Sequence, residues 1–173
     1  MISFRTAVAG DAEALVLLVN GGYCGEGSKR GWTTEADLLG GPRTDLERMR
    51  QTIGATDSRV ELARAEDGTL LGCAHLARGA DGSCYLGLLT VDPARQAGGV
   101  GTRILEHSEG VARAWGCRSV RMTVISARAE LIAYYERRGY ARTGATAPFP
   151  EDESRFRRPK VPGLRFVELA KAL

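Results

Sequence analysis

A glycine-rich turn between an apolar segment and a helical one is the part of the sequence best suited to chemistry. It occupies residues 89–102 and ends in Gln96-Ala97-Gly98-Gly99-Val100-Gly101-Thr102. Glycines leave successive backbone N–H groups uncovered, and the helix that follows adds unpartnered amides and the positive end of its dipole. Residues 93–105 include no acid that would occupy these amides, and they carry Arg95 and Arg103. We therefore expect a phosphate site here; the alternative is an ordinary turn whose amides are hydrated.

The spacing excludes two other phosphate-binding motifs. A P-loop needs a lysine after its last glycine, and no lysine occurs between Lys29 and Lys160. A dinucleotide fingerprint needs a third glycine where Ile104 stands, and an acid about 20 residues further on. No Asp or Glu occurs between Glu109 and Glu130, so nothing is placed to hold a ribose hydroxyl.

A second motif further along the chain makes the first one specific: Tyr134-Tyr135-Glu136-Arg137-Arg138-Gly139-Tyr140. Together, the two segments resemble the Q/R-x-x-G-x-G/A and Y-E-x-x-G-F/Y motifs of the GNAT superfamily of acyl-CoA-dependent N-acetyltransferases. The Val91-Asp92-Pro93 strand end before the first motif is also typical of that family. The resemblance covers residues 59–143 well and the two ends of the chain loosely.

The resemblance implies a site for acetyl-CoA as co-substrate. The strand end formed by Leu89, Thr90 and Val91 would contact it, with the backbone of Leu89 and Val91 pairing with the pantetheine arm. The pyrophosphate would be held by main-chain amides of the turn, from Gln96, Ala97, Gly98, Gly99, Val100, Gly101 and Thr102.

Two positions of the second motif's helix bear on the reaction. Tyr135 would face the sulfur and protonate the departing thiolate, while the Val91 N–H would hold the oxyanion; the alternative is that Tyr135 is a packed core tyrosine. Arg128 stands where the family often has Asn, and Leu131 where it often has a small residue. We expect Arg128 to contact the cofactor, in a way that differs from the common pattern.

The acceptor side is less defined. An alkylammonium must lose a proton before it attacks a thioester, so a base or a water chain is required. His75 and His107 fall within apolar patterns and are expected to be structural. The resemblance places Trp32, Glu35 and Asp37 in a segment that covers the acceptor, although Asp37 and Glu35 also fit the capping box of a short helix, and Trp32 a hydrophobic staple.

Composition limits the partners. The 24 basic and 21 acidic side chains are interspersed and leave a formal charge of +3, so we expect no nucleic-acid partner. No apolar stretch of membrane length occurs, and acids appear early in the chain, so we expect neither membrane insertion nor secretion. The four cysteines form no C-x-x-C pair and only two histidines are present, which indicates reduced thiols, a cytoplasmic protein and no metal site.

The hydrophobic periodicity predicts the elements that must position these residues. Expected strands are 2–7, one from Arg59 to the turn at 66–68, 69–77, 84–91, 120–124, 140–143 and 165–169. Expected helices start at the cap Asp11 and stop at Asn20-Gly21-Gly22, start at capping boxes 34–37 and 44–47, and span 99–115 and 126–138, the last capped by Ser126. Residues 144–163, rich in proline and charge, are expected to be a long loop serving as a lid, a binding loop or a disordered arm.

These expectations combine into one α/β domain over residues 1–173, with a mixed, mostly antiparallel sheet of about 6–7 strands flanked by about 4–5 helices. We expect an acetyl-CoA-dependent N-acetyltransferase for a small primary amine, with no nucleic acid and no membrane as partner, and we allow for a homodimer. Two alternatives stay open: a protein lysine or N-terminal acetyltransferase, and a CoA-binding module without turnover.

Overall fold

A twisted sheet forms the centre of the computed structural model, which describes residues 1–31, 33–149 and 157–173. In the described chain the sheet has seven strands in the order β1-β3-β4-β5-β6-β9-β7, antiparallel at every step except β5–β6. This confirms the mixed α/β architecture predicted from the sequence. The strands are β1 (Ser3–Thr6), β3 (Ser58–Arg64), β4 (Leu70–Arg78), β5 (Ser83–Val91), β6 (Ser119–Ile125), β7 (Ala141–Pro148) and β9 (Arg165–Ala172).

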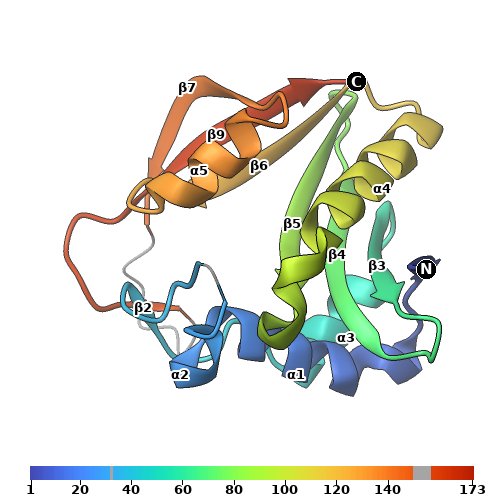
Figure 1. Ribbon diagram of the computed structural model, residues 1–173. Helices are drawn as coiled ribbons and strands as arrows, with labels where there is room; N and C mark the ends of the chain where they lie inside the picture. The colour runs from blue at the N-terminus through green and yellow to red at the C-terminus, as the bar shows by residue number, and fades with distance from the viewer. Residues whose placement is uncertain (32, 150–156) are drawn as a thin grey trace.

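Helices cover both faces of the sheet (Figure 1). They are α1 (Ala12–Tyr23), α2 (Gly25–Ser28), α3 (Leu46–Gly54), α4 (Val100–Ala114) and α5 (Ala129–Glu136), with short 3₁₀ helices η1 (Ala9–Asp11) and η2 (Pro93–Gly98). Apolar residues of α4 and α5 share one core cluster with β4, β5, β6 and β9, which places these two helices on the same face. Those of α1 and α3 share a second cluster with β3 and β4 on the opposite face.

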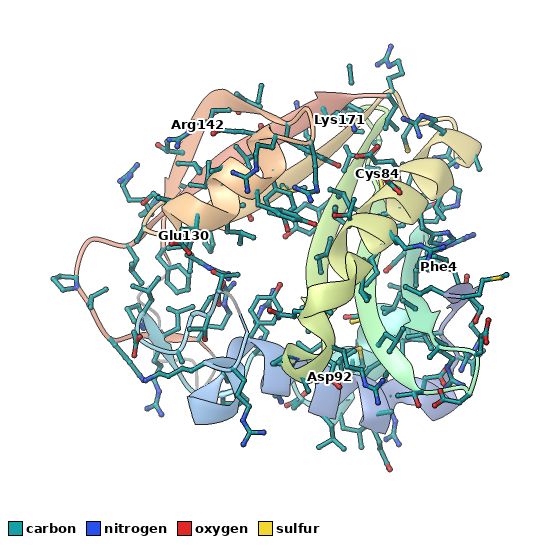
Figure 2. All side chains as sticks on the ribbon, viewed as in Figure 1. Phe4, Cys84, Asp92, Glu130, Arg142 and Lys171 are labelled. Atoms are coloured by element: carbon teal, nitrogen blue, oxygen red, sulfur yellow. The ribbon has the colours of Figure 1, made fainter. Side chains whose placement is uncertain are left out.

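The sheet opens between β5 and β6. Backbone pairing of these parallel strands covers only Ser83–Tyr85 and Ser119–Arg121. Beyond that point β5 stays with β4 and β6 stays with β9, so the two halves of the sheet diverge (Figure 1). Figure 2 shows Cys84 near the closed end, and Asp92 and Glu130 at the two open ends.

A bulge in β5 lies beside this opening. His75 faces Gly87 and Cys73 faces Thr90, so β5 has one more residue than β4 over this stretch. Leu88 takes a left-handed conformation there, with φ of +48°. Its carbonyl accepts a hydrogen bond from Thr90 Oγ1 at 2.9 Å. A non-glycine residue in this region costs about 1–3 kcal/mol, which the surrounding core must offset.

The two glycines expected to stop α1 lie within the helix, and Gly22 serves packing. The helix continues through Gly21 and Gly22 to Tyr23, so the predicted end at residues 20–22 is wrong. A Cβ on Gly22 would lie 2.5 Å from Thr90 Cγ2, so the missing side chain lets α1 approach β5 closely. The Asn20 side chain accepts hydrogen bonds from the Arg43 and Thr44 amides at 2.8 and 3.1 Å.

At two predicted helix starts, the observed N-terminal cap differs from the predicted one. Asp11 stands at the N-cap of α1, but its carboxylate binds the Val8 amide and the Arg5 guanidinium rather than the helix. Asp45, not Thr44, caps α3, accepting from the Arg48 amide at 2.8 Å. The start of α1 therefore has no side-chain cap, and the cap of α3 is one residue later than the sequence predicted.

The other two predicted starts do not begin helices. Residues 34–37 form a single turn, in which the Leu38 and Leu39 amides donate to the Glu35 carbonyl. Ser126 lies in a turn after β6, and α5 begins only at Ala129 with Arg128 at its N-cap. The predicted helix start at the 34–37 capping box and the predicted Ser126 cap are therefore wrong.

The segment expected to be a long loop contains paired backbone at both ends. Strand β7 continues to Pro148, and β8 (Arg158–Pro159) pairs with β2 (Leu39–Gly40). The prediction of a structureless segment 144–163 is therefore wrong for its described parts, while residues 150–156 lie outside the described residues. The short β2–β8 ladder brings the C-terminal region beside the turn that holds Glu35.

Candidate active site

A cavity of about 260 Å³ lies where β5 and β6 diverge. Its lining brings together most of the cofactor residues that the sequence singled out: Leu89, Thr90, Val91, Gln96, Gly99, Gly101, Thr102 and Arg128. Tyr135 lines it as well. Ala97 and Gly98 belong to η2 in the same turn, and Val100 points into the core, where it is 5% exposed. We call this space the strand cavity.

The turn before α4 leaves its first amides without a side-chain cap. Asp92 caps η2 instead, accepting from the Ala94 amide at 3.0 Å. Gly99 is the N-cap of α4 with φ of +69°, a conformation that favours glycine, and the first turn of α4 carries no acid. A Cβ on Gly101 would lie 3.3 Å from the Tyr134 hydroxyl, so a side chain there would narrow the cavity. This arrangement fits an anion bound by main-chain N–H groups.

Arg138 adds positive charge to the mouth of the strand cavity. Its guanidinium stacks 3.6 Å from the centre of the Tyr134 ring and donates to Thr102 Oγ1 at 2.8 Å and to the Tyr134 carbonyl at 2.9 Å. These contacts join α5 to the start of α4. Arg138 stands inside the second motif, but its residue type and spacing alone indicated no role for it.

Tyr135 lies deep in the molecule and is 5% exposed. Its ring makes edge contacts with Tyr134 and Tyr140, with ring centres 5.3 and 5.8 Å away. Burial raises the pKa of Tyr135, and the nearby Tyr23 and Tyr134 phenols raise it further. The hydroxyl therefore keeps its proton at neutral pH, as both a proton donor and a core tyrosine would.

A smaller cavity of about 60 Å³ adjoins the first. The two share the side chains of Tyr23, Leu89, Arg128, Leu131 and Tyr135. The Tyr23 hydroxyl donates to the Leu89 carbonyl at 3.1 Å and so fixes this common wall. Its remaining polar lining includes Glu35, which the sequence singled out, and Arg43, Tyr85 and Arg157, which it did not. Because three arginines line this space, we call it the arginine cavity.

Glu35 and Arg128 meet in the arginine cavity. Glu35 is 5% exposed; it accepts from Arg128 Nη1 at 2.9 Å and from Arg157 Nη2 at 3.1 and 3.2 Å. The second terminal nitrogen of Arg128 donates to Thr33 Oγ1 at 3.1 Å. These contacts tie α5 and the C-terminal region to the turn at residues 33–39.

Asp37, His75 and His107 line neither cavity. The Asp37 side chain is 77% exposed and pairs with Lys29 at 3.1 Å, whereas Trp32 lies outside the described residues. His75 Nε2 bonds Ser58 Oγ at 2.8 Å, and burial lowers the pKa of His75. His107 bonds Glu61 at 2.7 Å. Both histidines thus have structural partners, as the sequence predicted.

The described residues offer neither a metal site nor a membrane-spanning helix. Within residues 1–31, 33–149 and 157–173, no group of three or more His, Cys, Asp or Glu side chains could hold a metal ion. The helices in these same ranges include none with the length and apolarity needed to cross a membrane.

Comparison with known proteins agrees with this geometry. Residues 31–140 match the family described as Acetyltransferase (GNAT) family. An IAA acetyltransferase of Azospirillum brasilense is 32% identical over 103 residues, which are 59% of this chain and 67% of that protein.

Solved structures of two acetyltransferases share the fold. The ribosomal-protein-S18-alanine N-acetyltransferase from Escherichia coli has a TM-score of 0.71 at 15% identity, with 99% of this chain and 94% of that chain covered. An acetyltransferase from Bacillus anthracis, in complex with acetyl coenzyme A, has a TM-score of 0.58 at 14% identity, with 71% and 66% covered. The family match, which extends over more than half of the chain, shows that this protein belongs to the GNAT family and is an acetyltransferase.

Proposed function

We propose that this protein transfers the acetyl group of acetyl-CoA to a primary amine of a small molecule, by direct attack while both substrates are bound. The observation that carries the proposal is the shared wall of Leu89 and Tyr135. It separates a cavity suited to an anion and an extended chain from a smaller polar cavity. The donor would occupy the strand cavity and the amine would enter from the arginine cavity.

Acetyl-CoA would supply a thioester, whose carbonyl carbon is activated toward amines. The main chain of residues 96–102 would hold its pyrophosphate, because the start of α4 offers amides, a dipole and no competing acid. The edge of β5 at Leu89 and Val91, which β6 leaves unpaired, would bond the pantetheine arm. Arg138 supports this assignment, because it adds a cation at the same mouth.

Tyr135 would donate a proton to the departing sulfur. Its hydroxyl stays protonated at neutral pH, and its ring lies in the wall common to both cavities. The Val91 N–H would stabilise the negative charge that develops on the carbonyl oxygen. A donor held in a buried site needs little rearrangement when the reaction occurs.

Removal of the amine's proton falls to water. Among the described residues that line the arginine cavity, Glu35 is the carboxylate, and two guanidiniums already occupy its oxygens. We therefore assign Glu35 the role of a counter-ion that positions Arg128 and Arg157. The proton would leave through water in the mouth of the cavity.

A small acceptor is favoured over a protein. The arginine cavity has a volume of about 60 Å³, enough for the reacting end of a small molecule. The name of the Azospirillum brasilense relative points the same way, whereas the Escherichia coli neighbour acts on a ribosomal protein, so the fold does not decide the acceptor.

Free thiols at Cys24, Cys73, Cys84 and Cys117 support a cytoplasmic location.

Thiol release tests the proposal. Purified protein with acetyl-CoA should release free CoA only when a suitable amine is added, in a colorimetric assay against a panel of small amines. Acetyl-CoA binding without amine-dependent thiol would instead favour a module without turnover. Acetylated lysines or N-termini in peptides, found by mass spectrometry and without small-amine turnover, would favour a protein acceptor.

A further inference from the structure

Among the described residues that line the arginine cavity, arginine side chains outnumber carboxylates. Arg43, Arg128 and Arg157 line it, and Glu35 is the acid in the described lining. That one carboxylate already pairs with both Arg128 and Arg157. Counted over the described residues, three guanidiniums against one carboxylate give this small space a charge of about +2.

Among the described residues, Arg43 has no anionic partner. Its guanidinium contacts the Tyr23 ring, 5.6 Å from the ring centre, and no carboxylate of the described residues pairs with it. Its Nε is buried without a hydrogen-bond partner, as are the Nε atoms of Arg128 and Arg157. Burial and the positive charge of Arg157 lower the pKa of Arg43, so its surroundings disfavour a cation.

Such an arrangement is costly in the free protein. A buried charge is ordinarily paired, and a buried donor is ordinarily bonded. Guanidinium groups recognise carboxylate and phosphate-like anions through parallel N–H donors, so a bound anion would supply the missing partners.

We infer that the acceptor carries an anionic group, a carboxylate or a phosphonate, close to its amine, and that Arg43 and Arg157 bind this group. The inference rests on the proposed function and names its substrate class. The anion would sit among the guanidiniums, and the amine would then point to the Leu89–Tyr135 wall. Positive charge around the amine also favours its neutral, reactive form over the ammonium.

The anion site is distinct from the phosphate site at the start of α4. Gly99, Gly101 and Thr102 line the strand cavity, whereas Arg43 and Arg157 line the arginine cavity. Loss of Arg43 should therefore weaken the use of an acidic acceptor without weakening acetyl-CoA binding.

Paired acceptors give the sharpest test. A panel of amino acids and aminophosphonates is compared with the uncharged carboxamide or ester of each, by kcat/KM in the thiol-release assay. We expect the anionic member to be preferred by about 10- to 100-fold, the range for a hydrogen bond to a charged group. Carboxamides and esters that react as well as their acids would overturn the inference and leave the proposed function standing.

Substitutions of Arg43 test whether this residue causes the preference for anionic acceptors. Arg43→Gln should lower kcat/KM for the acids about 10- to 100-fold, mainly through KM, with a much smaller loss for the carboxamides, and Arg43→Lys should recover part of the loss. Arg50→Gln, the same change on the exposed side of α3, is the control and should have no effect. Calorimetric binding of acetyl-CoA confirms that each variant is folded.

Two other results would count against this account. Undiminished preference for acids in Arg43→Gln would overturn the role of Arg43. No thiol release with any amine, while acetyl-CoA still binds, would contradict the proposed function itself, and the inference about the acceptor would fall with it.

Discussion

At the scale of single residues, two adjacent tyrosines have different surroundings. Tyr134 lies at the mouth of the strand cavity, with its hydroxyl 3.3 Å from Thr102 Oγ1 and Arg138 stacked on its ring. Tyr135 is buried in the wall that both cavities share. The position of Tyr135 therefore suits a proton donor, and that of Tyr134 suits support of the phosphate turn.

Removal of the Tyr135 hydroxyl distinguishes a proton donor from a tyrosine that only packs in the core. Tyr135→Phe should lower kcat by about 10²- to 10⁴-fold, the usual contribution of a general acid or base, while the Kd for acetyl-CoA changes little. The matched control is Tyr140→Phe, since Tyr140 belongs to the same aromatic cluster but bonds Glu109 and lines neither cavity. Equal kcat for Tyr135→Phe and the wild-type protein in steady-state assays would leave Tyr135 as a core residue only.

The sequence pointed to the residues of the phosphate turn and, in the arginine cavity, to Glu35 and Arg128 but not to Arg43 or Arg157. The residues of the phosphate turn are close in sequence, because the strand end, the glycines and the helix start follow one another within residues 89–102. The Glu35 contacts are not local, since they join residues 93 and 122 positions apart. Neither spacing nor composition signals such a pairing, and only the folded sheet brings Arg43, Arg128 and Arg157 together.

At the scale of elements, the approach of α1 to β5 shapes the wall between the cavities. Gly22 lies against Thr90, and the next residue, Tyr23, reaches the Leu89 carbonyl with its hydroxyl. A side chain at position 22 would push the helix away and move this hydroxyl. The two glycines at 21 and 22 look alike in sequence but differ in this contact.

Alanine at each glycine tests the contact. Gly22→Ala should lower the free energy of unfolding by about 1–3 kcal/mol through overpacking, and Thr90→Ser, which removes the methyl group 2.5 Å away, should restore most of it. A Cβ at position 21 would have no atom within 4 Å, so Gly21→Ala should stabilise the helix by about 0.5–1 kcal/mol. Urea unfolding measures all of these, and equal effects at positions 21 and 22 would contradict the packing account.

Long periodic elements were predictable and short paired ones were not. The apolar run of β5 and the stripe of α4 gave their positions to within a residue or two. The β2–β8 ladder has two residues on each strand, too few for any periodicity. Helix ends were the least predictable, because Asn20, Asp11 and Ser126 found partners or positions that sequence spacing does not encode.

At the scale of the whole molecule, two half-sheets joined at one end create the site. The closed end is held by the β5–β6 pairing and by a buried cluster in which Glu109 binds Lys171 at 2.9 Å and Tyr140 at 3.1 Å. The open end places α4 and α5 on either side of the strand cavity (Figure 1). Under the proposed function, the acetyl donor and the amine acceptor would therefore approach each other from the two cavities at the wall they share.

The central claim is that uncapped amides at the start of α4 bind the pyrophosphate of acetyl-CoA. Thr102→Glu would place a carboxylate in the first turn of α4, where it competes with the anion and repels it, whereas Thr102→Gln has the same size without charge. Calorimetric titration of acetyl-CoA should give a Kd at least about 10-fold weaker for Thr102→Glu than for Thr102→Gln, with a smaller gap at high salt. Equal affinities of the two variants, or no binding heat with the folded wild-type protein, would contradict the account.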